Sequence, residues 1–290
     1  MTRNILAERN IERLRAVASG GALLAFDYDG TLAPISNDPA ASRMRDETSE
    51  LLRNLAHAAP VAVITGRSVR DVIVRLEDIP MLAVIGNHGA EPSPFAKRAA
   101  REVTNWMPML KAVVATLPQV EIEDKAMSVS VHYWHVTDPS VVIEAIDRLV
   151  PTLPHAVEVV HGIGIVNLIP HGAPNKGDAL RRVMQEHALP GAVFVGDELT
   201  DESAFRVLDG DHSLGIRVGR WKDSAATFHI PTQLDIDALL TELLIGRTRP
   251  QERPHAEPDG SGSPPTEVAS ETSQLHAYGT ETATRDGTDG

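Results

Sequence analysis

Two carboxylates end a wholly apolar segment near the start of the chain. "ALLAF" (22–26) runs directly into Asp27 and Asp29, and Gly30 and Thr31 follow. In an extended chain, residues i and i+2 point to the same side. The two charges would therefore repel by ~3–4 kcal/mol at a separation of ~4–5 Å and an effective dielectric of about 20. A proton, a basic neighbour or a metal ion must offset this repulsion.

Three further segments carry polar residues where an apolar run ends or a helix begins. These residues are Thr65, Gly66 and Arg67 after "VAVI", Lys176 at the start of "KGDALRRVMQEHA", and Asp197 with Asp201 after "AVFVG". Open α/β sheets bind ligands at the carboxyl ends of their strands, and carboxylates are ligands that Mg²⁺ prefers. The sequence therefore predicts a Mg²⁺ site made by Asp27, Asp29 and Asp197, with Asp201 as a further candidate ligand.

This set of residue types suits phosphoryl transfer. Asp27 would attack phosphorus and form an aspartyl-phosphate intermediate. Asp29 would protonate the leaving alcohol and then deprotonate the attacking water. Thr65 and nearby backbone N–H groups would hold phosphate oxygens, and Lys176 would supply a compact positive charge.

The elements that must position these residues alternate between strand and helix. Apolar runs predict strands over 22–26, 61–65 and 81–86, and helical spacing predicts helices over 4–18, 46–59 and 68–77. Such alternation favours an α/β fold, in which right-handed crossovers connect the strands of a parallel, Rossmann-like sheet.

The pattern changes after about residue 92. A long helix (about 95–117), two strands within 119–134, a helix over 138–153 and a hairpin over 156–169 give an α+β order. We therefore predict a core at 1–91 and 171–248 and an inserted α+β cap at 92–170. Residues 249–290, poor in apolar residues, are predicted to be a disordered acidic tail.

The ordered motifs resemble those of the haloacid-dehalogenase superfamily: DxDGT, a Thr at a strand end, a Lys, and GDxxxD. Only 33 residues separate Thr31 from Thr65, whereas 110 separate Thr65 from Lys176. The resemblance is therefore to members whose cap follows the second motif, and it implies a phosphorylated small molecule as substrate.

Within that superfamily the chain is most similar to trehalose-6-phosphate phosphatases. "FDYDGTLAPI", "VITGRS", "IGNHGAE" and "GDELTDESAF" look like segments of that family, and "EDKAMSVSVHYW" resembles its sugar-reading hairpin. The resemblance implies a Mg²⁺-dependent phosphatase of trehalose biosynthesis. It implies substrate contacts by Glu123, Lys125, Ser128 and His132 on the cap, and by Gly66, Arg67 and His88 on the core side. The chain departs from the family pattern at Trp134, Asn167 and Leu168, where charged residues are usual.

Composition narrows the classes of function. A net charge of −13 over 290 residues speaks against nucleic acid as the main partner. The absence of cysteine excludes thiol catalysis, and no apolar run reaches the ~18–20 residues of a membrane span. With no signal peptide we expect a cytoplasmic protein; its protein partners are not indicated. Alternatives are a phosphatase of another sugar phosphate, a phosphomutase of the same superfamily, and an inactive binding module.

Overall fold

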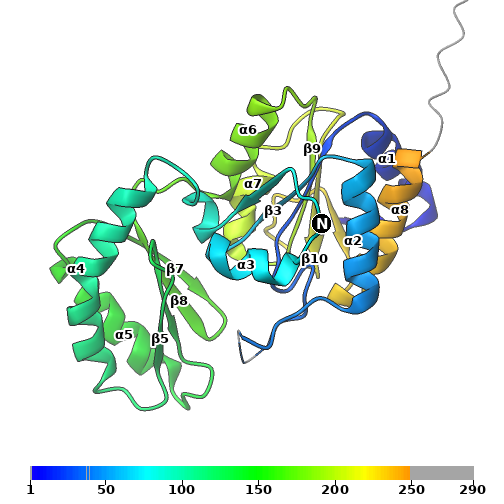
Figure 1. Cartoon of the computed structure of the whole chain (residues 1–290). Coiled ribbons are helices and arrows are strands. Elements are labelled where there is room, and N and C mark those ends of the chain that lie inside the picture. The colour runs from blue at the N-terminus through cyan, green and yellow to red at the C-terminus, as the bar shows by residue number, and fades with distance from the viewer. Residues whose placement is uncertain (1, 37, 39, 249–290) are drawn as a thin grey trace, which may run out of the picture. The chain divides into compact units, whose positions relative to one another are not determined.

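The larger of two sheets is wholly parallel (Figure 1). The structure is a computed structural model and describes residues 2–36, 38 and 40–248. The strands of this sheet are, in spatial order, β1 (Arg3–Asn4), β11 (Phe228–Ile230), β10 (Leu214–Val218), β9 (Ala192–Gly196), β2 (Leu23–Phe26), β3 (Val61–Ile64) and β4 (Ala83–Ile85). Every pair is parallel, and β2, β3 and β9 are fully buried. The predicted α/β class with a parallel sheet is confirmed.

Helices cover both faces of this sheet. One face packs against α1 (Glu8–Ser19), α2 (Asp46–Ala58), α3 (Val69–Leu76) and α8 (Ile236–Thr248). The other packs against α6 (Lys176–Glu186) and α7 (Glu202–Phe205). Strand β2 packs against the helices on both faces, because Leu24 belongs to the first apolar cluster and Leu23 to the second. No helix of the described residues is long and apolar enough to cross a membrane.

The N-terminal helix begins later than the sequence predicted. Residues Arg3–Asn4 form β1, which pairs with Phe228–His229 of β11, a strand that the sequence did not reveal. The Asn4 side chain accepts a hydrogen bond from the Leu6 backbone N–H at 3.0 Å. The polar Asn4 therefore ends the strand and turns the chain before α1 starts at Glu8.

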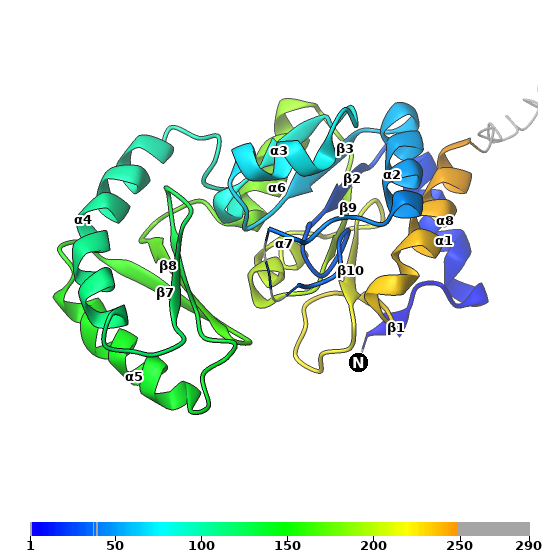
Figure 2. The same ribbon diagram turned by 60° about the horizontal axis from the view of Figure 1, so that its bottom comes forward.

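The second sheet is antiparallel and lies in the predicted insertion (Figure 2). Its order is β5 (Glu121–Asp124), β6 (Val129–His132), β8 (Ile165–Pro170) and β7 (Val157–Gly162). Helices α4 (Ala96–Val114) and α5 (Pro139–Leu149) pack on one face over a core that includes Trp106, Val129 and Val131. We call this sheet with its two helices the cap. Its elements all lie within 92–170, while the exact domain boundaries stay a prediction, and the predicted tail lies outside the described residues.

A short 3-10 turn at Asn87–Gly89 connects the two sheets. The Asn87 side chain donates to Glu91 at 2.9 Å and accepts from the Ser128 hydroxyl of the cap at 3.1 Å. The His88 backbone N–H donates to the carbonyl of Thr65 at 2.9 Å. The turn therefore fixes the end of β3 and the cap to one another. Three further 3-10 turns lie at Val150–Thr152, Leu199–Asp201 and Gln233–Asp235.

His88 should make the stability of the fold depend on pH. Burial lowers the pKa of its imidazole from 6.5 to about 3. Below pH 6.5 the unfolded chain therefore takes up a proton that the folded chain refuses, and folding becomes less favourable as the pH falls. Between pH 6.5 and pH 5 the loss should be about 2 kcal/mol.

Denaturant titrations from pH 7.5 to pH 5 of the unmodified chain and of His88→Asn would measure this effect. The variant should lose stability less steeply with falling pH. His57, which is exposed on α2, supplies the control variant His57→Asn. Equal slopes for His88→Asn and the unmodified chain would contradict the assignment.

Candidate active site

Two neighbouring strands bring acidic residues together. Strand β2 pairs with β9, and the Asp27 backbone N–H donates to the carbonyl of Val195 at 2.9 Å. Asp27 follows β2, and Asp197 and Glu198 follow β9. Because the carboxyl ends of parallel strands meet at one edge of the sheet, the predicted convergence of Asp27 with Asp197 follows from the register.

Lys176 lies in the middle of this acidic group. Its ammonium nitrogen is 2.9 Å from Asp27 Oδ2, 3.1 Å from Glu198 Oε1 and 2.7 Å from Asp201 Oδ1. The Lys176 side chain is fully buried, and an ammonium has three N–H donors. The ammonium donates hydrogen bonds to Glu198 and Asp201 and forms an ion pair with Asp27. The helix that carries Lys176 starts at Asn175 with a reciprocal capping box to Asp178, which fixes the lysine at the first position of α6.

The loop after β9 is held in place from two sides. The Thr31 hydroxyl donates to Asp197 Oδ1 at 3.1 Å. Gly30, at φ +77°, passes so close to the Asp197 carboxylate that a side chain there would collide with it. Arg217 donates to the carbonyl oxygens of Asp197 and Glu198. These contacts fix the carboxylate of Asp197 beside the loop that carries Asp27.

The cluster carries more negative than positive charge, with four carboxylates around one ammonium. Burial raises the pKa of Asp27 well above its usual value despite Lys176. Burial, Asp201 and Glu198 raise the pKa of Asp197 in the same way. The pKa of Asp201 is also raised, chiefly by burial.

Two members of the cluster are stabilised in their charged forms. Burial alone would raise the pKa of Glu198, but Lys176 and His88 lower it to about 2. Burial alone would lower the pKa of Lys176, but Asp201, Asp27 and Glu198 raise it well above its usual value. The lysine is therefore a permanent cation, and it leaves Asp27 and Asp197 short of positive charge.

This donor set fits a divalent cation. Oxygen atoms of Asp27, Glu198 and Asp201 lie within 4.8 Å of one another, but Lys176 already occupies the space among them. Asp27, Asp197 and Glu198 line the adjoining cavity, whereas Asp201 does not. Asp27 and Asp197, whose carboxylates face the cavity, are therefore the candidate ligands for such a cation. Asp201, the further candidate ligand, instead binds Lys176 and the Glu198 backbone N–H.

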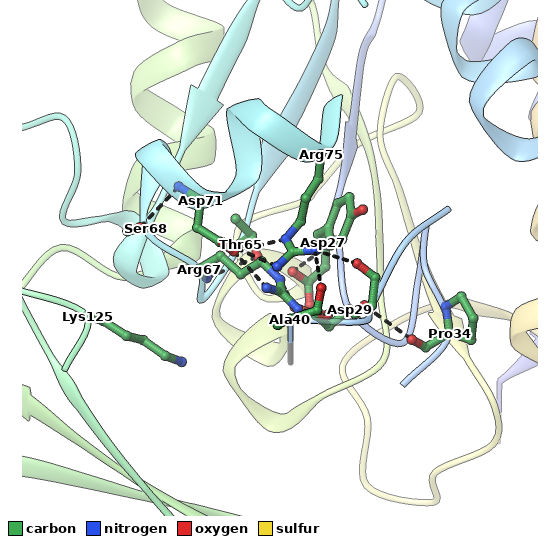
Figure 3. A network of polar contacts seen from close by, with 12 residues as sticks. Asp27, Asp29, Pro34, Ala40, Thr65, Arg67, Ser68, Asp71, Arg75 and Lys125 are labelled. Carbon is green, nitrogen blue, oxygen red and sulfur yellow. Dashed lines mark hydrogen bonds and ion pairs between the residues drawn. The ribbon is translucent and has the colours of Figure 1, made fainter. Parts of the chain in front are cut away.

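The structure does not bring the carboxylate of Asp29 into the acidic cluster. Arg67 binds it through two hydrogen bonds of 2.6 Å, and the Ser42 hydroxyl donates to it at 2.7 Å. Arg67 also donates to Asp71 at 2.7 Å, and Figure 3 shows its guanidinium between these partners. The predicted roles of Asp29 as a metal ligand and of Arg67 as a substrate contact stay predictions, and in this structure the two side chains bind each other.

The sheet of the cap turns polar side chains toward the core. Alternate residues of β6 belong to the apolar cluster under α4 and α5. His132, at the end of this strand, lies 2.9 Å from Glu123 Oε2, and the Lys125 ammonium is 3.6 Å from the same oxygen. These three side chains form a charged patch on the cap. Ser128, also predicted to contact substrate, instead donates to Asn87.

One cavity of about 580 Å³ joins the two halves of the site. Ten of the thirteen predicted site residues line it, namely Asp27, Asp29, Thr65, Gly66, Arg67, His88, Glu123, Lys125, His132 and Asp197. Lys176, Ser128 and Asp201 lie behind this lining. The two ring nitrogens of His88 are buried, and neither has a hydrogen-bond partner among the described residues. The His88 imidazole on the cavity wall therefore has unused hydrogen-bonding capacity.

Sequence reasoning missed several lining residues. Glu198 and Leu199 follow the recognised Asp197, so the same strand end could have indicated them. Arg217, Arg220 and Trp221 lie beyond the last recognised motif, and Ile163 lies in the hairpin of the cap. No local pattern singles out these four residues, because their position depends on how distant segments pack.

Comparisons with known proteins agree with this geometry. The model of the family described as trehalose-phosphatase matches residues 25–232. The probable trehalose-phosphate phosphatase D of Arabidopsis thaliana is 27% identical over 260 residues, covering 80% of this chain and 70% of that protein. The trehalose-phosphate phosphatase of Mycobacterium tuberculosis is 31% identical over 231 residues, covering 75% of this chain and 59% of that protein.

A solved structure described as a trehalose-6-phosphate phosphatase related protein superposes with a TM-score of 0.63. It is 27% identical in sequence, and the match covers 77% of this chain and 97% of that one. The resemblance to haloacid-dehalogenase phosphatases with a cap is therefore confirmed in both sequence and structure. Since the family match extends over the acidic cluster, Lys176 and the whole cap, the chain belongs to the trehalose-phosphatase family.

Proposed function

We propose that this protein hydrolyses trehalose 6-phosphate to trehalose and inorganic phosphate. The observation that carries the proposal is a nucleophile-type carboxylate, Asp27, 2.9 Å from a buried ammonium. It lies on the wall of a cavity that also contains the charged patch of the cap. A phosphate group suits the Asp27 end, and sugar hydroxyls suit the cap, because hydroxyls both donate and accept hydrogen bonds.

The first half of the reaction transfers the phosphoryl group to Asp27. A carboxylate oxygen of Asp27 forms a bond to phosphorus as the bond from phosphorus to the sugar oxygen breaks. Asp29 gives its proton to the departing oxygen, so trehalose leaves as the neutral alcohol. Lys176 and the Tyr28 backbone N–H, which donates to Asp27 Oδ1 at 2.7 Å, hold the nucleophile still.

The second half releases phosphate. Water attacks the phosphorus of the aspartyl phosphate, the bond to Asp27 breaks, and Asp29 accepts the proton of the water. Arg67 keeps Asp29 in the cavity wall through two hydrogen bonds, and the carboxylate left by the first half of the reaction accepts this proton. To accept the proton, Asp29 must give up a contact with Arg67 and contact substrate or water instead.

Asp27 and Asp197 would hold a Mg²⁺ ion, which neutralises the negative charge of the phosphate and the two carboxylates when it is bound. Thr65, Gly66 and Arg67 line the same end of the cavity, where they would contact phosphate oxygens. Glu123, Lys125 and His132 would bind hydroxyls of the sugar, and His88 would add a neutral donor or acceptor between the two groups. The expected location in the cytoplasm stays a prediction.

A panel of sugar phosphates assayed for phosphate release with Mg²⁺ tests the proposed function. We expect kcat/KM for trehalose 6-phosphate to exceed that for glucose 6-phosphate by at least ~100-fold, because the cap patch binds a second ring that glucose 6-phosphate lacks. Sucrose 6-phosphate, whose second ring is a furanose, tests whether the patch also distinguishes the kind of ring. If phosphate is released only from other sugar phosphates, the protein is a phosphatase, but trehalose 6-phosphate is not its substrate. An isomeric sugar phosphate in place of free phosphate would indicate a mutase.

Replacing the nucleophile should abolish turnover. Asp27→Asn keeps the size and the hydrogen-bond acceptor of the side chain but cannot form the aspartyl phosphate, so kcat should fall by at least ~1,000-fold. Asp211→Asn changes an acid whose side chain is 97% exposed and should retain activity. Turnover by Asp27→Asn near that of the unmodified protein would refute the role of Asp27.

Removing the buried ammonium should destabilise the fold as well as stop the reaction. Lys176→Met leaves three carboxylates without their shared cation, and breaking such a buried ion pair costs about 3–5 kcal/mol. Denaturant titration at pH 7.5 would measure the loss. Lys111→Met, on the exposed side of α4, is the matched control, and a loss for Lys176→Met no larger than that of the control would contradict the shared-ammonium arrangement.

A further inference from the structure

Half of the exposed large apolar side chains among the described residues line one cavity. Ten large hydrophobic side chains are exposed among the described residues. Five of these line the cavity that contains Asp27, namely Ile35, Trp134, Ile163, Leu199 and Trp221. Scattered exposed hydrophobics are ordinary, but a cluster beside a polar site marks a binding surface.

Trp134 is held at the cap edge of this cavity. It follows β6, and the preceding residue, Tyr133, donates its backbone N–H to the carbonyl of Gly164 at 2.8 Å. A side chain at Gly164 would come within 2.5 Å of the indole carbons Cδ2 and Cε3 of Trp134. The indole therefore packs against the turn between β7 and β8, and 37% of the residue stays exposed.

Trp221 has a corresponding support on the core side. The guanidinium carbon of Arg217 lies 4.8 Å from the centre of its ring. Arg217 is fixed in turn by Glu202 at 3.0 Å and by the carbonyl oxygens of Asp197 and Glu198. Trp221 is 36% exposed, so an indole surface remains for the cavity while the Arg217 contact ties the ring to the loop of the acidic cluster.

We propose that Trp134 and Trp221 are the specificity-determining residues for the sugar ring that carries no phosphate. This inference rests on the proposed function, because the phosphate must lie at Asp27 and the phosphorylated ring beside it. The second ring then reaches the part of the cavity that these indoles line. A pyranose presents C–H groups on its faces and hydroxyls on its rim. The faces suit the electron-rich face of an indole, and the rim suits Glu123, Lys125 and His132.

A wholly apolar group is the alternative ligand for the cavity wall that Ile35, Trp134, Ile163, Leu199 and Trp221 form. His132, Arg220 and His161 line the same cavity, so it offers polar partners as well as apolar surface. A ligand with alternating hydroxyl and C–H surfaces satisfies both kinds of neighbour, whereas an acyl chain would leave the polar groups without partners.

Tryptophan fluorescence can report this contact directly. The chain has three tryptophans, and the third, Trp106, is fully buried in the cap. Trehalose 6-phosphate added with Mg²⁺ to the non-hydrolysing Asp27→Asn variant should change the emission. Glucose 6-phosphate, which lacks the second ring, should give less than about a third of that change. Trp134→Phe and Trp221→Phe should each reduce the response, and the double substitution should remove it.

Kinetics on the otherwise unmodified enzyme complete the test. Trp134→Ala and Trp221→Ala should each raise KM for trehalose 6-phosphate by about tenfold, with a smaller change in kcat. Val141→Ala, which alters an exposed apolar residue of the cap outside the cavity, should leave KM unchanged.

The two possible failures are separable. If the unmodified enzyme does not hydrolyse trehalose 6-phosphate, the proposed function fails. If it does, but the response persists in the double Phe variant or both Ala variants keep the original KM, the role of the two tryptophans is overturned.

Discussion

The ammonium of Lys176 satisfies three carboxylates that would otherwise repel one another in a buried site. Asp27 follows β2, whereas Glu198 and Asp201 lie in the loop after β9, and the lysine lies within 3.1 Å of an oxygen of each. Lys176, Asp27 and Asp201 are buried and Glu198 is partly exposed, and removing such charges from water costs free energy that close pairing must offset. The order of the strands, the capped start of α6 and the fixed loop after β9 are all required for that pairing. The rest of the site depends on this one contact group.

The same arrangement gives the acidic residues of the site two different environments. Lys176 fills the space among three carboxylates, and the excess negative charge therefore lies on the cavity side, at Asp27 and Asp197. That side is where phosphate and a divalent cation would meet. Asp29 follows Asp27 by two residues, but Arg67 holds its carboxylate apart. The proposed nucleophile and the proposed proton-transfer group, both aspartates, thus have different neighbours. The cap adds the charged patch and, with Trp134 and Ile163, part of the apolar lining of the cavity.

Much of the core could be predicted from the sequence because its information is local. The apolar run ending at Phe26, the acids after it, and the strand-to-helix order place Asp27, Thr65 and Asp197 at one sheet edge without knowledge of other contacts. The pairing of Asp29 with Arg67 was missed, because the residues are 38 positions apart and nothing in either segment indicates the contact. Strand β11 was missed because three residues carry too little periodicity. Trp221 was missed because its position depends on Arg217, whose own partners lie in the loop after β9.

A crystal structure with Mg²⁺ and inorganic phosphate would test the central arrangement most directly. We expect the Lys176 ammonium to stay on Asp27 and Asp201, and the cation to be bound by Asp27 and Asp197 from the cavity side. A cation found among Asp27, Glu198 and Asp201, with Lys176 displaced from them, would contradict this arrangement.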